Sequence, residues 1–113
     1  MSQSDVFTVV TSEDLNEFLA NLWNYKKKPF LAKGVIAPQF EFGQIICIGN
    51  KFVKGGYFLK KIDYDRESAP RGIVIRETKE RVGFVYLQAY LKKDYSSDID
   101  YKAKHNVYKV SLT

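Results

Sequence analysis

The feature that most constrains the fold is one amphipathic segment near the N-terminus, in a chain whose other apolar stretches are short. Residues 11–14 (Thr-Ser-Glu-Asp) supply an N-cap hydroxyl and two acids for a first helical turn. The pattern predicts a helix over residues 12–26 that Pro29 ends, with the three lysines at 26–28 complementing the helix dipole. Its apolar face is formed by large residues at helical spacing: Leu15, Phe18, Leu19, Leu22 and Trp23.

The remaining apolar stretches are rich in β-branched and aromatic residues, which is typical of strands. A polar connection at residues 78–81 (Thr-Lys-Glu-Arg) separates two of them and predicts a hairpin. Residues 92–104 are polar and are expected to be irregular, while apolar residues in 105–113 favour a last edge strand. The other predicted strands cover residues 5–10, 30–36, 57–63, 73–75 and 82–91.

The segment 38–53 has two interpretations. Pro38 can begin a helix with apolar residues on one side, whereas the isoleucines around Cys47 prefer a strand and the glycines weaken a helix. The sequence therefore predicts one α+β domain over residues 1–113, with a mixed or antiparallel sheet and the 12–26 helix packed on one side. The order is β-α-β-α-β-β if 38–53 is helical. Residues 96–113 are expected to form a C-terminal extension or an edge strand.

The familiar kinds of catalysis lack their residues in this chain. The single histidine, His105, lies in a polar segment, and the single cysteine, Cys47, lies in an apolar run that predicts a buried thiol. Zinc needs more Cys or His ligands than these, so we expect no enzyme, no metal and no cofactor. One enzymatic alternative stays open, a metal-dependent nuclease that uses the alternating acids Asp63, Asp65 and Glu67, although such a pattern is also typical of a solvated strand end.

Charge is distributed unevenly along the chain. Residues 1–25 hold four acids and no Lys or Arg, so the other 88 residues carry all 18 basic side chains against nine acids. A basic surface accelerates association with polyanions, and nucleic acid is the first candidate partner. The sequence contains no signal pattern and no apolar stretch of membrane-spanning length. We therefore expect an intracellular protein, cytoplasmic or in the nucleoid or nucleus, with no membrane partner.

Cations and aromatic rings alternate in two regions of the chain, which is typical of surfaces that contact phosphates and stack on bases. On the predicted strand 82–91, alternation places Phe84, Tyr86, Gln88 and Tyr90 on one face and an apolar set on the other. The predicted phosphate contacts are Lys51, Lys54, Lys60, Lys61, Arg76, Lys79 and Arg81. The predicted stacking or dimer-surface residues are Tyr57, Tyr86 and Tyr90.

Read with a helix at 38–53, the element order resembles the Alba superfamily of chromatin and RNA-binding proteins. Gly34 with residues 43–46 (Gly-Gln-Ile-Ile) is similar to the family's glycine and second-helix segment, and residues 50–52 (Asn-Lys-Phe) to the end of that helix. Residues 76–82 and the strand after them are similar to the family's last hairpin. The resemblance covers roughly residues 6–95 and implies a dimeric nucleic-acid binder that contacts its ligand around Lys79 and Arg81.

These observations predict a small basic protein that binds DNA or RNA largely through the backbone, as a homo- or heterodimer. The alternative is a non-enzymatic protein-interaction module, such as a viral or plasmid-encoded inhibitor or a subunit of a larger complex. In that case the acidic helix at 12–26 and the aromatic strand at 82–91 would form the docking surface.

Overall fold

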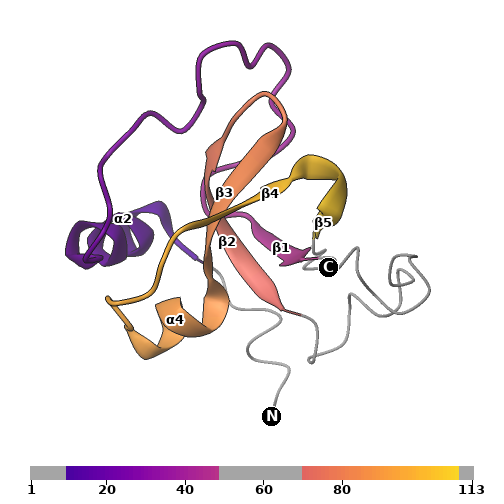
Figure 1. Cartoon of the computed structure of the whole chain (residues 1–113). Helices are drawn as coiled ribbons and strands as arrows, with labels where there is room; N and C mark the ends of the chain where they lie inside the picture. The colour runs from indigo at the N-terminus through magenta and orange to yellow at the C-terminus, as the bar shows by residue number, and fades with distance from the viewer. Residues whose placement is uncertain (1–9, 49–69, 110–113) are drawn as a thin grey trace.

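The computed structural model of the chain describes residues 10–48 and 70–109, which form a five-stranded antiparallel sheet with two short α-helices (Figure 1). The predicted α+β class is confirmed. The helices are α2 (Ser12–Asn21) and α4 (Leu87–Lys92), and one 3-10 turn forms η1 (Lys104–Asn106). The strands are β1 (Ile45–Ile48), β2 (Arg71–Glu77), β3 (Arg81–Tyr86), β4 (Asp100–Ala103) and β5 (Val107–Lys109).

The sheet is strongly curled, and the connection between its two edges requires this. The strand order is β4-β3-β2-β1-β5, so the consecutive strands β4 and β5 occupy opposite edges. In a flat sheet, four interstrand steps of about 4.8 Å would hold these edges roughly 19 Å apart. The three residues of η1 join them, although a 3-10 helix rises only about 2 Å per residue. Figure 1 shows β4 passing across β3 toward η1, as this curl demands.

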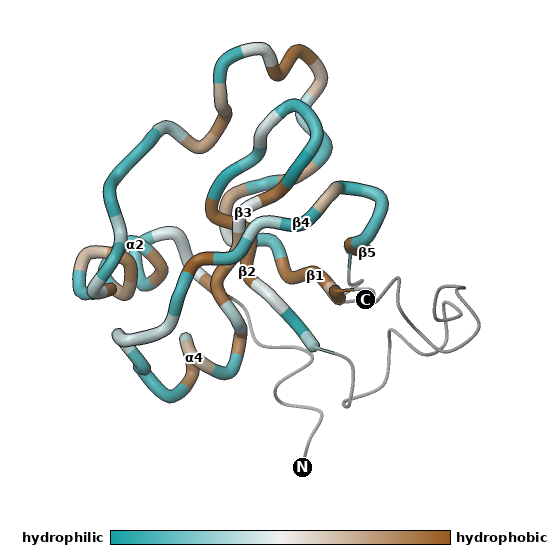
Figure 2. The backbone as a smooth tube through the Cα atoms, viewed as in Figure 1, coloured by the Kyte–Doolittle hydropathy of each residue, from teal (hydrophilic) through white to brown (hydrophobic). Residues whose placement is uncertain are grey.

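Both faces of the sheet are covered by apolar side chains. The residues that line the inside of the curl form an inner cluster of Phe40, Ile46, Ile48, Val74, Val82, Phe84 and Val107. The opposite face packs against both helices in an outer cluster of Leu15, Phe18, Leu19, Leu22, Ile45, Ile73, Ile75, Val85, Leu87 and Ala89. The hydrophobic colour of β1 and of the central strands in Figure 2 follows from this burial on both sides.

Helix α2 begins where the sequence predicts and ends five residues early. The Thr11 hydroxyl accepts a hydrogen bond from the Asp14 N–H at 3.1 Å, as an N-cap should. Leu22 has an extended backbone, and its N–H donates to the Leu19 carbonyl. In a continuing α-helix, the Trp23 N–H would donate to that carbonyl. The Trp23 N–H instead donates to the Tyr95 carbonyl at 2.8 Å. The predicted helical conformation of residues 22–26 is therefore wrong, and lysines 26–28 do not lie in a helical last turn.

The predicted strand at 30–36 is also wrong. This segment meets the sheet through one isolated parallel bridge between Leu31 and Glu77. The Glu77 N–H donates to the Phe30 carbonyl and the Ala32 N–H donates to the Glu77 carbonyl, each at 2.8 Å. A turn that includes Gly34, at a φ of 94°, then carries the chain away from the sheet, so the pairing cannot extend.

Of the two interpretations of 38–53, the strand is confirmed for Ile45–Ile48, and the helix is wrong there. All four residues are buried, because the strand has neighbours on both sides and apolar clusters on both faces. The order β-α-β-α-β-β is not seen in the described residues. Residues 49–53 lie outside them, as do the predicted strand at 57–63 and all but the last residue of the predicted strand at 5–10.

The predicted hairpin at 78–81 is confirmed. The Thr78 N–H donates to the Arg81 carbonyl at 2.8 Å, and the Thr78 hydroxyl accepts from the Arg81 N–H at 2.9 Å. The strand after it was expected to run to Leu91, but it ends at Tyr86, where its pairing with Gly72 also ends. Residues 87–92 then form α4 from good helix formers, and Lys93 closes it in the left-handed conformation at a φ of 55°.

The C-terminal part of the described chain is more regular than the sequence predicts. Residues 92–104 were expected to be irregular, yet Asp100–Ala103 forms β4, because β3 offers it a free edge over Arg81–Phe84. The predicted last edge strand is confirmed for Val107–Lys109, which pairs with β1.

Candidate functional site

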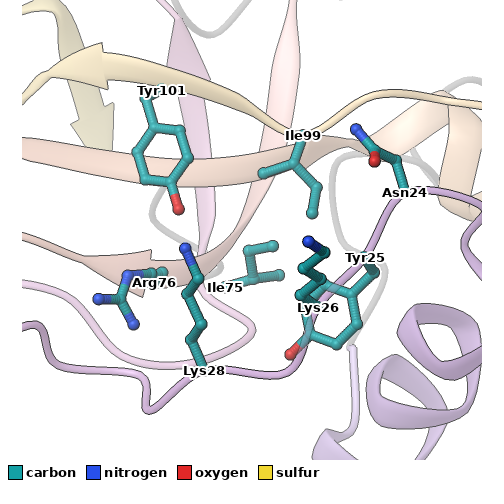
Figure 3. A pocket seen from close by; sticks show the side chains of 8 residues that line it. All are labelled: Asn24, Tyr25, Lys26, Lys28, Ile75, Arg76, Ile99 and Tyr101. Carbon is teal, nitrogen blue, oxygen red and sulfur yellow. The ribbon is translucent and has the colours of Figure 1, made fainter.

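A basic pocket of about 330 Å³ opens on the outer face of the sheet, beside the segment that follows α2 (Figure 3). The segment supplies one wall, and β2, β4 and the approach to β4 supply the others. Three of its lining side chains are cations and two are tyrosines. The lining residues are Asn24, Tyr25, Lys26, Lys28, Ile75, Arg76, Ile99 and Tyr101.

The early end of α2 places the lysines of this pocket. Because Leu22 turns the chain out of the helix, residues 24–28 run along the sheet rather than around a helical axis. The segment is tied down at both ends, by the Trp23 N–H on the Tyr95 carbonyl and by the Arg76 guanidinium, which donates from Nη1 to the Pro29 carbonyl. Lys26 and Lys28 lie between these two attachments, so the loop before β4 and strand β2 together fix the path of their backbone.

Arg76 and Tyr101 are brought together by strand register. Arg76 of β2 pairs with Gly83 of β3, and Gly83 pairs with Tyr101 of β4. The row therefore crosses three adjacent strands. A Cβ atom on Gly83 would lie 2.7 Å from Cε2 and 2.9 Å from Cζ of the Tyr101 ring. The absence of a side chain at Gly83 lets the Tyr101 ring lie directly against the strand.

The charged side chains that line the pocket are all basic. Among the described residues, no carboxylate lines it, whereas Lys26, Lys28 and Arg76 do. In Figure 3 the Lys28 ammonium and the Arg76 guanidinium lie on the same side of the pocket, and the Tyr101 hydroxyl points toward Lys28. Ile75 and Ile99 supply apolar surface between the polar groups. Such an arrangement can hold an anion beside a flat apolar group.

The sequence-predicted hairpin cations lie next to this pocket in the sheet. Lys79 and Arg81 are exposed at the β2–β3 turn. Arg81 precedes Gly83 by two residues on β3, so it faces the same side of the sheet. Of the predicted phosphate contacts, Arg76 therefore lies in the pocket and Arg81 extends its basic surface along the hairpin.

Two of the predicted stacking tyrosines lie on different elements, each packed against another aromatic ring. The Tyr86 hydroxyl donates to Asp100 Oδ2 at 2.8 Å, and its ring packs edge-on against the buried Phe84. Burial and the Asp100 carboxylate raise the pKa of Tyr86 to about 12. Tyr90 lies on α4, in edge contact with Phe18 of α2 at 5.5 Å. The common aromatic face of 84–90 does not exist, because the strand ends at Tyr86.

The remaining predicted site residues, Lys51, Lys54, Tyr57, Lys60 and Lys61, lie outside the described residues, as do the alternating acids Asp63, Asp65 and Glu67. The sequence interpretation missed Tyr25, Lys26, Lys28 and Tyr101. The lysine run was assigned to a helix end that lies further upstream, and its position between two tyrosines depends on long-range pairing. The available signal was the run itself, with Tyr25 directly before it.

A second concavity of about 310 Å³, the acidic groove, separates α2 from α4. It is lined by Asp14, Glu17, Phe18, Tyr90, Leu91, Lys93 and Tyr95. Phe18 contacts both tyrosine rings, at centroid distances of 5.5 Å and 5.4 Å. Burial and the Asp14 charge raise the pKa of Tyr90. The acidic groove and the basic pocket have different lining residues, so the described surface holds two regions of unlike charge.

No protein-family model, curated protein or solved structure matches this chain. Within residues 10–48 and 70–109, no three or more His, Cys, Asp or Glu side chains gather as a metal-binding group. None of the described helices has the length and apolar character needed to cross a bilayer. The candidate site is thus defined by its geometry and charge alone.

Proposed function

We propose that this protein binds nucleic acid, DNA or RNA, through contacts to the phosphate backbone. The observation that carries the proposal is the basic pocket, where Lys26, Lys28 and Arg76 line one concave surface that no described carboxylate shares. Lysine and arginine contacts to phosphates release counterions and supply most of the affinity in sequence-independent binding. The exposed Lys79 and Arg81 on the adjacent hairpin lengthen this surface.

The geometry also accounts for the placement of the cations. In a solvated charge run, lysines need no fixed backbone, whereas residues 24–28 lie between two attachments, one to the loop before β4 and one to Arg76 of β2. Arg76 is half-buried, so its guanidinium is oriented before a ligand arrives. Preorganised donors lose less conformational entropy on binding than free lysine side chains do.

A salt titration tests the proposal. We expect the affinity for a labelled 20-nucleotide strand, measured by fluorescence anisotropy, to fall linearly in a plot of log affinity against log salt concentration. The double variant Lys26→Ala/Lys28→Ala should reduce this slope by about two, one for each lost phosphate contact.

The matched control is Lys92→Ala/Lys93→Asn, which removes the same charge from α4, outside the basic pocket. Asparagine at 93 tolerates the left-handed backbone there. This control should change the slope by much less than the pocket variant. Affinity that does not respond to salt, or an equal response of the two double variants, would refute backbone binding at this surface.

A second candidate function rests on the acidic groove. Asp14 and Glu17 of α2 lie beside Tyr90 of α4, so the acidic helix and part of the aromatic segment do share one concave surface. This favours a docking site for a basic side chain of a protein partner, which carboxylates and aromatic rings both attract. Loss of a partner from Asp14→Asn/Glu17→Gln, with nucleic-acid binding unchanged, would support this function.

A further inference from the structure

We infer that the basic pocket receives one unpaired nucleotide, with its base against the Tyr101 ring and its phosphate among Lys26, Lys28 and Arg76. This inference rests on the proposed function and specifies its ligand. It predicts that the protein prefers single-stranded nucleic acid, and that the preference depends on Tyr101 rather than on charge.

The first argument is the exposure of the Tyr101 ring. One side of the ring contacts Gly83, yet 40% of the residue remains accessible, so part of the ring is available to a ligand. Tyr86, by comparison, has its hydroxyl bonded to Asp100 and its ring packed on Phe84. An aromatic ring that lies against backbone and keeps accessible surface can serve as a platform on which a base stacks.

The second argument is the mixed lining of the pocket. A site for inorganic phosphate alone needs donors and positive charge, and Ile75, Ile99 and the tyrosine rings would add nothing to it. A nucleotide has both a flat apolar face and a phosphate. The volume of about 330 Å³ lies at the small end of the range for ligand pockets, so it suits one nucleotide rather than a long segment of strand.

The third argument separates single strands from duplexes. In a duplex, both faces of each base are covered by neighbouring pairs, so no base can lie on Tyr101 unless it is flipped out at an energetic cost. Asn24 brings an amide that can both donate and accept at the edge of a base. In a duplex this edge is occupied by the complementary strand. The pocket therefore favours an unpaired base in two independent ways.

The cations are arranged to hold the phosphate next to such a base. The Arg76 guanidinium uses Nη1 on the Pro29 carbonyl, and within residues 10–48 and 70–109 this is its one hydrogen bond, so further N–H groups can meet a ligand. In Figure 3 the Lys28 ammonium lies between Arg76 and the Tyr101 hydroxyl, and the Lys26 side chain lies near Tyr25 across the pocket. A phosphate near Lys28 and Arg76 would leave the space between the Tyr101 ring, Ile99 and Asn24 for the base.

The unpaired nucleotide can belong to a strand or can be free. We would measure binding of labelled (dT)12, of a 12-base-pair duplex and of AMP, and competition by inorganic phosphate. The single tryptophan, Trp23, is 65% exposed and directly precedes Asn24, so its fluorescence gives a label-free signal. Tyr101-dependent binding of (dT)12 without AMP binding would identify a strand. Tyr101-dependent binding of AMP would identify a free nucleotide as a ligand too.

The decisive variant is Tyr101→Leu, which keeps apolar bulk on the edge strand and removes the ring. We expect it to weaken binding of (dT)12 about tenfold and to leave duplex binding within twofold of the unmodified protein. Tyr101→Phe is the conservative control and should retain single-strand affinity. Gly83→Ala should act like Tyr101→Leu, because its Cβ would displace the ring; a thermal melt of each variant confirms that it is folded.

The outcomes distinguish this inference from the proposed function. Equal loss of single-strand and duplex affinity in Tyr101→Leu, or no loss at all, would overturn the nucleotide pocket while salt-dependent binding stands. Competition by inorganic phosphate as effective as competition by AMP would overturn the role of the base. Absence of salt-dependent binding to either nucleic acid would remove the proposed function itself, and this inference with it.

Discussion

Lys104 donates a hydrogen bond from Nζ to Oε2 of Glu77 at 2.7 Å, and this pair connects η1 to the last residue of β2. Glu77 is fully buried, and its carboxylate also accepts from the backbone N–H groups of Gln39 and Phe40. One carboxylate thus links three segments that are distant in sequence: the approach to β1, the end of β2 and the connection between the sheet edges.

Removing one partner of this pair should be costly. Lys104→Met leaves a buried carboxylate without its cation, and we expect it to lower the free energy of unfolding by about 3 kcal/mol. Urea denaturation at pH 7 measures this. Lys102→Met, on β4 and exposed, is the matched control and should change stability by less than about 0.5 kcal/mol. Similar losses in the two variants would contradict the structural role of Glu77.

Glu77 should also make the fold sensitive to acid. Burial raises the pKa of its carboxyl, but the hydrogen bonds from Lys104, Gln39 and Phe40 outweigh burial and hold the pKa below its ordinary value. A folded-state pKa below the unfolded one contributes stability above the unfolded value, and that stability is lost as pH falls through the folded value. We expect the urea concentration at half-unfolding to decrease as the pH drops below about 4.5. In Glu77→Gln this decrease should be less steep.

The Tyr86 hydroxyl should make the stability of the fold sensitive to alkaline pH. Its pKa is raised to about 12 by burial and by Asp100, so the folded state holds the proton more tightly than the unfolded state does. The stability gained from this is complete below about pH 10 and is lost as pH rises toward 12. Ultraviolet titration of tyrosine absorbance should show a component that ionises near pH 12 and disappears in Tyr86→Phe.

Tyr86→Phe also separates stability from binding. We expect it to lower the free energy of unfolding by about 1 kcal/mol, because Asp100 loses a hydrogen bond between β3 and β4. Nucleic-acid affinity should stay unchanged, since the hydroxyl faces Asp100 and not the basic pocket. Affinity that falls with Tyr86→Phe in a folded variant would give the hydroxyl a part in binding that its hydrogen bond to Asp100 does not predict.

Gly72 provides a test of the inner cluster. A Cβ atom at this position would lie 2.6 Å from Cδ2 of the buried Phe84 ring, in a core that cannot easily yield. Gly72→Ala should therefore destabilise the fold by about 1–3 kcal/mol in urea denaturation. Gly34→Ala is a useful comparison, because nothing lies within 4 Å of its Cβ position and its cost arises from the backbone alone.

The parts of the fold that the sequence predicts are those with local causes. The α2 N-terminus follows from a hydroxyl three residues before the N–H that donates to it, and the hairpin follows from the turn residues between two β-branched runs. The end of α2 has a distant cause, since Trp23 gives its N–H to Tyr95. The end of β3 likewise depends on where β2 begins, which no local pattern in 82–91 reveals.

The sequence predicts a basic surface, but it does not identify most of the residues that line the candidate site. Charge distribution predicted an anion-binding surface, and the sequence proposed Arg76 and Arg81 as phosphate contacts because they flank a hairpin; Arg76 lines the basic pocket and Arg81 begins β3. Tyr101 could not be found from its own neighbourhood, because its exposure depends on Gly83 in the adjacent strand. Tyr86 was chosen on an alternation that assumed one solvated face, whereas the curl of the sheet and α4 bury both.

The short connection η1 has a consequence for self-association. The edge strands that it joins are short, with four residues in β4 and three in β5. Such short edges offer few free backbone groups for pairing with a strand of another chain. A homodimer of this protein would consequently be built by complementary side-chain surfaces instead of a continuous intermolecular ladder. The acidic groove between α2 and α4 and the basic pocket that follows α2 are two such surfaces of opposite charge.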